Sequence, residues 1–417
     1  MAATLMTTDA RRAAAMAEAD GVRECLQWFT REKQWTNERH IELCRIPSPT
    51  FLEQARGEWM AAQFRALGWK TETDRAGNVV ATRPEPAESP SAALTAHLDT
   101  VLAPRKPEEI QVFGDGREFG PGVADNGAGL AALLAVAAAL QSAPASDWSE
   151  RIALVANVGE EGEGNLSGMR YLCRQSPLAA TLRSFVVLDG PGTDSITAHA
   201  LGSRRFEIVY TGAGGHSWTD YGTANPVHAL CRAVVLFNDS RTKPASSIEP
   251  RYSFNFGLIE GGSSINSIPA EARAKVDLRA ESQRKMDEMA ELLNECVERA
   301  LETENERSNG VKLGVRMREI GSRPGGRLSD KAPILGAVRG ADHYLGIRAQ
   351  MDCSSTDANI PISLGLDALS IGAGGQGGGA HTTAEWYNPE GRDLGLKRIL
   401  LAMCLVASGN QDASGAS

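Results

Sequence analysis

The sequence predicts an α/β protein with a mostly parallel central sheet flanked by helices, and a second, α+β domain inserted into the chain. Through roughly the first 200 residues, short apolar runs alternate with helical runs, which is typical of a parallel sheet. Farther along, strand-like runs alternate polar and apolar residues and are accompanied by long helical stretches, as in a ferredoxin-like β-α-β-β-α-β unit. The length of 417 residues agrees with more than one domain.

The expected boundaries follow from where this pattern changes. In the first part and at the end of the chain, strands are expected at 78–82, 92–98, 152–158 and 185–188, and helices at 53–67, 129–141 and 394–407. The alternating strands are expected at 205–211, 252–259 and 272–278, and the long helices at 226–238 and 282–304. We therefore expect one split domain, residues 1–201 and 325–417, and an inserted domain, residues 202–324.

Composition and charge argue against several classes of protein. Lys and Arg number 43 against 52 Asp and Glu, a net charge of −9 without a basic stripe, so we expect no nucleic-acid partner. The longest apolar run, residues 129–140, is too short to cross a membrane, and residues 1–25 lack the apolar core of a secretory signal. The seven cysteines are scattered and form no CxxC pair, which favours a reduced, cytoplasmic protein without a thiolate zinc site.

One histidine and two aspartates follow predicted strands or precede a predicted helix. His97 and Asp99 lie two residues apart at a strand end, where alternate side chains point the same way, so Asp99 can orient a metal-bound imidazole. Asp125 lies in a glycine-rich turn before an apolar helix, and its carboxylate can bridge two cations. The simpler interpretation is that each aspartate only caps a helix.

Further potential ligands occur later in the chain. Glu160 and Glu161 are adjacent after an apolar strand, so their side chains diverge, and one can bind a metal while the other acts as a base. Asp189 follows another strand, and His381 lies in a glycine-rich loop. A solvated acidic loop and a flexible turn are the simpler alternatives. Because ligand sites of α/β sheets lie at the carboxyl ends of strands, these nitrogen and oxygen donors together predict a site for zinc, manganese or cobalt.

Eight segments resemble the motifs of a family of dinuclear metallopeptidases. In chain order they read TAHLDTV, GPGVADNGAG, VGEEGEG, VVLDG, GAGGHSW, INSIPAEARAKVDLR, SSTDAN and GGGAHTTAEWY. The family includes carboxypeptidase G, the tripeptide aminopeptidase peptidase T, aminoacylase and acetylornithine deacetylase. The resemblance runs from about residue 45 to residue 406 and implies a catalytic α/β domain with the insert as a lid and dimerisation domain.

The resemblance also implies a role for individual residues. It implies two divalent metal ions, most simply zinc, with manganese or cobalt as alternatives. Asp99 would orient His97, Glu160 would be the general base, and the peptide bond after Asp125 would be cis. The implied metal ligands are His97 and Asp189 for one ion, Glu161 and His381 for the other, and Asp125 as the bridge.

The insert and the late SSTDAN motif supply the remaining implied residues. His216 would reach the active site of a partner subunit and stabilise an oxyanion there. Asn266 and Arg279 would contact the substrate, and Arg279 could bind a carboxylate bidentately, although a surface salt bridge is the alternative. Asp357 would shape the wall of the substrate pocket. The histidines outside the motifs are expected to be structural: His40, His199, His228 and His343.

Together these features predict a dinuclear metal-dependent hydrolase that cleaves the C–N bond of a peptide or amide in a small substrate with a carboxylate. A water shared by the metals would attack, with Glu160 as the general base. Two alternatives stay open: hydrolytic deamination of an aromatic amino acid such as a nitro-substituted aminobenzoate on the same metal site, and an inactive ligand-binding protein on this fold. We expect a homodimer through the insert, with a higher assembly also open, and no membrane partner.

Overall fold

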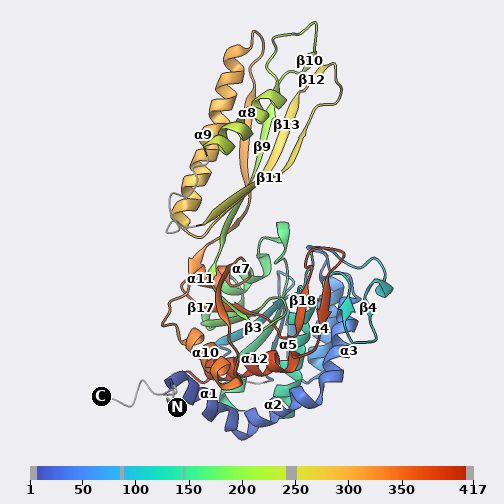
Figure 1. Ribbon diagram of the computed structural model, residues 1–417, viewed down its shortest axis with the longest axis vertical. Coiled ribbons are helices and arrows are strands. Elements are labelled where there is room, and N and C mark those ends of the chain that lie inside the picture. The colour runs from blue at the N-terminus through green and yellow to red at the C-terminus, as the bar shows by residue number, and fades with distance from the viewer. Residues whose placement is uncertain (1–6, 85–88, 144–145, 241–250, 410–417) are drawn as a thin grey trace, which may run out of the picture. The chain divides into compact units, whose positions relative to one another are not determined.

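The computed structural model of the chain describes residues 7–84, 89–143, 146–240 and 251–409 (Figure 1). The chain divides into two compact units. The first consists of residues 1–200 and 327–417, and the second of residues 201–326. The second unit is therefore an insertion in the sequence of the first.

The first unit is built on a central sheet with the strand order β1-β2-β6-β3-β7-β17-β8, and β16 also pairs with β8. Strands β6, β3, β7 and β17 are parallel neighbours, whereas β1 and β2 run antiparallel at one edge. This confirms the predicted mostly parallel sheet. The strands are β1 (Lys70–Thr73), β2 (Val79–Thr82), β3 (Ala92–His97), β6 (Ile152–Asn157), β7 (Ser184–Leu188), β8 (Ser195–Ala200), β16 (Gln350–Ser354) and β17 (Asp367–Ile371).

Helices pack against both faces of this sheet, because its strands are apolar on both sides. Leu94 and Leu154 point into one core, which they share with seven helices. Their neighbours Ala93 and Val155 point into the other core, which contains α7 (Ser167–Arg174) and α11 (Asn359–Ser363). The helices of the first core are α1 (Thr8–Glu18), α2 (Asp20–Arg31), α3 (Lys33–Cys44), α4 (Gln54–Ala66), α5 (Gly127–Ser142), α10 (Pro333–Leu345) and α12 (Arg392–Ala407).

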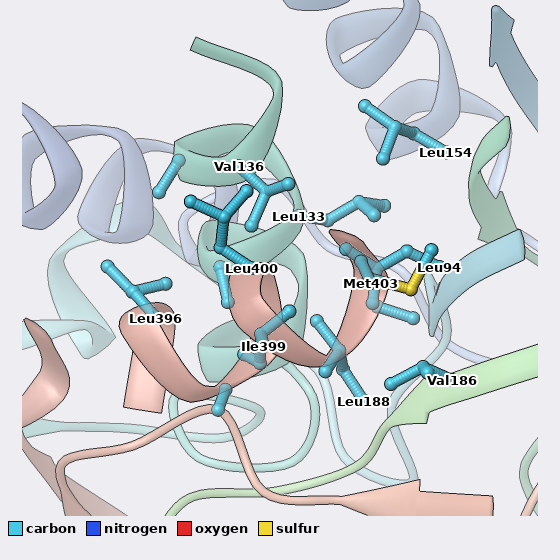
Figure 2. Packing of buried hydrophobic residues seen from close by; sticks show 14 of the residues in the cluster. Leu94, Leu133, Val136, Leu154, Val186, Leu188, Leu396, Ile399, Leu400 and Met403 are labelled. Atoms are coloured by element: carbon cyan, nitrogen blue, oxygen red, sulfur yellow. The ribbon is translucent and has the colours of Figure 1, made fainter. Parts of the chain in front are cut away.

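Helix α5 is buried along almost its whole length. Its sequence is apolar on all sides, which is typical of a helix in the core of a large domain. Figure 2 shows Leu133 and Val136 of this helix among side chains of α12 and of the central strands. The helix begins at Gly127, because the side chain of Asn126 accepts a hydrogen bond from the N–H of Gly129. The helix start is thereby fixed next to Asp125.

A small antiparallel sheet in the first unit joins two segments that are far apart in the sequence. Its order is β18-β19-β5-β4, and Trp386 in β19 pairs with Phe119 in β5. It ties the segment before Asp125 to the segment after His381. The strands are β4 (Gln111–Val112), β5 (Glu118–Phe119), β18 (Gln376–Gly378) and β19 (Trp386–Asn388).

The second unit is a β-α-β-β-α-β arrangement, as predicted. Its antiparallel sheet has the order β11-β13-β9-β14, in which the first and third strands of the unit lie at the centre. Tyr210 of this sheet donates a hydrogen bond from its hydroxyl to the Val297 carbonyl at 2.7 Å, which joins the sheet to the long helix. The elements are β9 (Gly202–Thr211), α8 (Pro226–Asp239), β11 (Tyr252–Gly261), β13 (Glu271–Ala280), α9 (Gln283–Arg307) and β14 (Gly314–Arg323).

Membrane-spanning helices were searched for over the described ranges. None of the helices found there is both long enough and apolar enough to cross a bilayer.

Candidate metal centre

His97 ends strand β3 and is almost fully buried. Its Nδ1 lies 2.9 Å from the backbone carbonyl oxygen of Asp99, which can only accept, so Nδ1 carries the proton. Its Nε2 lies 3.2 Å from Oδ1 of Asp125. Burial alone would lower the pKa of His97, but the hydrogen bonds to Asp125 and Asp99 raise this pKa well above its usual value. The Nε2 atom is the one presented to the centre of the site.

The carboxylate of Asp99 is fully buried and holds the loop after β6. It accepts the backbone N–H of Glu160 at 3.0 Å and of Glu161 at 2.8 Å, and the hydroxyl of Thr50 at 2.9 Å. Burial would raise the pKa of Asp99, but the hydrogen bond and charge of His97 and the two backbone hydrogen bonds lower it. The nearest acceptor for His97 is the carbonyl of Asp99, since the carboxylate lies farther away, at 3.5 Å.

His381 brings a second histidine to the same carboxylates. Its Nε2 lies 2.8 Å from Oε1 of Glu161 and 3.1 Å from Oδ2 of Asp125. These two hydrogen bonds raise the pKa of His381 to about 10. The φ angle of His381 is +64°, a left-handed backbone conformation within its glycine-rich loop. His97 and His381 therefore meet at opposite oxygens of Asp125.

Asp189 leaves strand β7 at the same end of the sheet. Burial and the nearby carboxylate of Asp125 raise the pKa of Asp189 to about 7. The charge of Glu161 acts in the same direction. A divalent cation bound here would stabilise the ionised form of this buried carboxylate.

These residues fit a metal site. Donor atoms of His97, Asp125 and Glu161 lie within 4.8 Å of one another. Apart from Nε2 of His97 at 3.2 Å, the buried Oδ1 of Asp125 finds no hydrogen-bond partner within the part of the chain that the structure describes, as expected of an oxygen that serves an ion. Imidazole and carboxylate donors without sulfur suit zinc, manganese or cobalt.

Backbone contacts hold the Asp125 segment in place. The Asp125–Asn126 peptide bond is cis, as the resemblance predicted. The side chain of Asn126 donates to the carbonyl of Leu188 at 2.8 Å, next to Asp189. His40, expected to be structural, is fully buried and lies 2.8 Å from the carbonyl of Val123 through its Nε2. The loop is thus fixed from strand β7 and from helix α3.

Two buried glutamates outside the set of predicted site residues also support the site. Glu385 accepts backbone N–H groups of the Asp125 loop, each at 2.8 Å. Glu53 accepts the N–H of Gly159, just before the Glu160–Glu161 pair, at 3.1 Å. Glu385 lies within the segment GGGAHTTAEWY, four residues after His381, which is the signal that could have identified it. Glu53 gave no signal, because it is predicted as part of an amphipathic helix.

The second unit brings two of the predicted residues together. Strand β10 (Gly215–His216) pairs with β12 (Ser267–Ile268), which places His216 beside the residue that follows Asn266. Nδ1 of His216 accepts the backbone N–H groups of Trp218 at 3.3 Å and Thr219 at 3.4 Å, which puts the ring proton on Nε2. His216 is exposed in this unit.

Two other predicted residues have partners within their own units. Arg279 donates from Nε to Asp277 at 2.8 Å, the salt bridge that had been the alternative interpretation of this residue. Asp357 is fully buried and accepts from the side chain of Asn157 at 2.6 Å. The roles of both residues in substrate binding stay predictions.

Two family models match the chain. Residues 199–305 match a peptidase dimerisation domain, and residues 78–224 match peptidase family M28. The first match covers most of the inserted unit, and the second covers the segments of four proposed ligands and Glu160. Both segments are therefore similar to peptidase domains, and the family resemblance predicted from the sequence is confirmed.

Curated relatives agree with this result. A protein of Aspergillus clavatus named "Probable carboxypeptidase" is 30% identical over 237 residues, which is 52% of this chain and 51% of the relative. One of the same name from Aspergillus oryzae is 27% identical over 271 residues, 58% of this chain and 60% of the relative. The chain spans about half to three fifths of the length of these relatives.

Solved structures show the fold. A tripeptidase from Staphylococcus aureus matches with a TM-score of 0.72 and 21% identity, over 90% of this chain and 99% of that one. The aminopeptidase PepT from Bacillus cereus matches with a TM-score of 0.69 and 19% identity, over 90% and 99%. Human carnosine dipeptidase 1 matches with a TM-score of 0.69 and 14% identity, over 93% and 99%. The fold class is confirmed.

Proposed function

We propose that this chain is a metal-dependent hydrolase that cleaves the C–N bond of a peptide or amide in a small substrate. The observation that carries the proposal is the convergence of His97, Asp125 and Glu161, whose donor atoms lie within 4.8 Å of one another. The buried Glu160 directly precedes Glu161 in the sequence and is not assigned as a metal ligand. A hydrolase of this type needs this combination of ligands and a separate base.

The proposed ligands divide between two cations. Asp125 is the bridge, because its two oxygens face the Nε2 atoms of different histidines, at 3.2 and 3.1 Å. His97 and Asp189 complete one position, and Glu161 and His381 complete the other. When bound, the two cations would lower the pKa of a shared water and polarise the substrate carbonyl. Zinc is the metal we propose, since imidazole and carboxylate oxygen are ligands it accepts readily.

Glu160 is the proposed general base. Its side chain is 5% exposed, and its backbone N–H is held by Asp99 at 3.0 Å, which limits how far it can move. Because adjacent side chains of an extended segment point in different directions, Glu161 can face the metals while Glu160 faces the substrate. Glu160 would take a proton from the attacking water and deliver it to the leaving nitrogen.

The inserted unit would supply substrate contacts within a homodimer. His216 holds its proton on Nε2, so it can donate a hydrogen bond to a developing oxyanion. The side chain of Arg279 is fixed by Asp277 but remains 41% exposed, which leaves its guanidinium able to receive a substrate carboxylate, with Asn266 as a second contact. Matches to carboxypeptidases and small-peptide peptidases favour a substrate with a free carboxylate.

The test is turnover of a mixed substrate panel. Protein stripped with a chelator would be reloaded with zinc, manganese or cobalt and offered di- and tripeptides, N-acyl amino acids and aminobenzoates, with products read by mass spectrometry. We expect peptide or amide cleavage that needs metal and falls by about 10²- to 10⁴-fold in Glu160→Gln. Glu163→Gln is the matched control, because Glu163 is an exposed carboxylate in the same loop.

The alternatives have distinct outcomes in this experiment. Ammonia released from an aminobenzoate, with no peptide or amide cleaved, would replace the proposal by hydrolytic deamination on the same residues. Absence of turnover with every metal would favour a ligand-binding protein. Equal losses in Glu160→Gln and Glu163→Gln would remove Glu160 from the role of base.

A further inference from the structure

Glu385 is a buried carboxylate beside the proposed bridging ligand that no step of the proposed chemistry uses. It immediately precedes strand β19, and its side chain is 2% exposed. Oε2 accepts the N–H of Gly122, and Oε1 accepts the N–H groups of Ala124 and Asp125, each at 2.8 Å. Glu385 is thus in direct contact with the backbone of Asp125.

A carboxylate is the side chain that suits this position. Buried backbone N–H groups must find acceptors, and three of them point at one place. A carboxylate accepts at both oxygens, whereas a glutamine amide would turn one of them into a donor facing the N–H of Gly122. Burial raises the pKa of Glu385, opposed by these backbone hydrogen bonds. The contact therefore depends on the two acceptor oxygens of this residue.

The backbone of Glu385 links the same two loops. Its carbonyl accepts the N–H of Gly120 at 3.0 Å, and the next residue, Trp386, pairs with Phe119. His381 lies four residues earlier in the same loop. The segment that carries His381 and the segment that carries Asp125 are therefore joined through Glu385.

The opposite side of the Asp125 loop is also held. The carbonyl of Val123 faces Nε2 of His40 at 2.8 Å, so the loop is fixed through its N–H groups by Glu385 and through a carbonyl by His40. Gly122 lies so close to Thr100, which follows strand β3, that a side chain at position 122 would collide with it. The loop can approach this strand because position 122 is a glycine. With its backbone fixed on both sides, Asp125 has little freedom to turn its carboxylate away from the two histidines.

We propose that Glu385 is a positioning residue. It orients the carboxylate of Asp125, and with it His381, for binding of the second metal ion, the one assigned to Glu161 and His381. The inference rests on the proposed metal site. Outer carboxylates that orient metal ligands contribute about 10- to 100-fold to metal affinity. Glu385 does so through the backbone of its ligand rather than through the ligand's side chain.

The test is calorimetric titration of the chelator-treated protein with zinc, together with the visible spectrum of the cobalt-loaded protein. We expect Glu385→Gln to bind the second zinc equivalent about 10- to 100-fold more weakly and to alter the cobalt spectrum. Asp342→Asn is the control, because Asp342 is a buried carboxylate that pairs with Arg398 and touches none of the proposed ligands. It should leave zinc affinity and spectrum unchanged even where it lowers the melting temperature.

The outcomes separate this inference from the proposed function. Equal zinc affinities, within about twofold, for the wild type and Glu385→Gln would overturn the role of Glu385 and leave the metal site standing. Zinc binding that is insensitive to Asp125→Asn would instead overturn the metal site itself. If Glu385→Gln does not fold, Glu385→Asp keeps the charge but shortens the side chain, and wild-type zinc affinity in that variant would equally contradict the inference.

Discussion

The carboxylate of Asp99 accepts the backbone N–H of Glu161 at 2.8 Å, so a residue on the β3 side of the site holds a proposed ligand on the β6 side. The same carboxylate accepts the N–H of Glu160, and the backbone carbonyl of Asp99 fixes the ring of His97. One buried residue thus sets the position of two ligands and of the proposed base. Glu385 does the same for the Asp125 loop, so both acidic ligand loops rest on buried carboxylates.

Replacing Asp99 by asparagine should therefore weaken metal binding without abolishing it. An asparagine side chain keeps one acceptor oxygen but turns an N–H₂ group toward the amides of Glu160 or Glu161. We expect metal affinity to fall about 10- to 100-fold and kcat/KM to fall with it, even at saturating metal. Zinc titration and steady-state kinetics on one substrate would measure both.

Thr50→Val is the matched control for Asp99→Asn. It removes only the hydroxyl that donates to Oδ2 of Asp99 and leaves both backbone contacts in place. We expect a loss of about 1 kcal/mol of stability and little change in zinc affinity. If Thr50→Val binds zinc as weakly as Asp99→Asn does, the loss of the backbone contacts of Asp99 is not the cause of the weaker zinc binding.

Zinc binding should release protons. In the metal-free protein the carboxylates around the site raise the pKa of His97 and raise that of His381 to about 10, which favours the charged form of both rings. Zinc binds the neutral ring and the ionised carboxylate, so protons leave the two histidines and Asp189, whose pKa is about 7, and zinc affinity rises with pH until the pH approaches the raised pKa values. Calorimetry between pH 7 and 9 in buffers of different ionisation enthalpy would measure this. Heats independent of the buffer would contradict it.

The fold could be predicted from the sequence because its pattern is consistent at each level. Residues 92–98 and 152–158 were expected as strands and form β3 and β6, and the predicted long helix 282–304 forms α9. The period of the apolar residues along the sequence indicates which side chains are buried. In a sheet of this size, the buried side chains are those that pack against the helices. The supporting strands β4, β5, β18 and β19 were missed, since runs of two or three residues carry no period.

Only some of the residues of the site could be predicted from the sequence, for a related reason. Short motifs identify residues that lie next to glycines or at strand ends, such as Asp125 and Asp189, and the structure brings both to one end of the sheet. Glu385 and Glu53 act through backbone N–H groups of segments 263 and 106 residues away. Contacts of that range depend on the path of the folded chain, which no local pattern of a single sequence reveals.

A buried carboxylate away from the ligands should make stability depend on pH. Glu118 is 1% exposed, and burial raises its pKa from 4.5 to about 7, opposed by Arg392. A raised pKa means that the native state binds the proton more tightly, so wild-type stability falls as pH rises from about 4.5 to 7. Glu118→Gln cannot ionise, so its stability relative to the wild type should increase by up to about 3 kcal/mol between pH 5 and pH 8. Urea unfolding of the chelator-treated proteins at both pH values would measure this.

Glu163→Gln serves as the control for replacing an exposed carboxylate by an amide. A Glu118→Gln difference that is also independent of pH would mean that Glu118 stays charged in the folded protein. In that case Arg392, whose Nη2 lies 3.9 Å from Glu118, and His40, whose Nδ1 lies 3.0 Å from it, would have to compensate fully for the burial of the carboxylate.

The proposed role of His216 in a partner subunit can be tested by mixing two inactive variants. His216→Ala lacks the oxyanion donor, and Glu160→Ala lacks the base, so each homodimer should have little activity. If His216 acts on the partner's site, a mixed dimer has one site with both groups intact. Random exchange of subunits then gives about a quarter of wild-type activity, since half of the dimers are mixed and half of their sites work. If the mixture is as inactive as its components while the solution mass shows dimers, His216 does not act on the partner's site. A solution mass of one chain would contradict the predicted dimer.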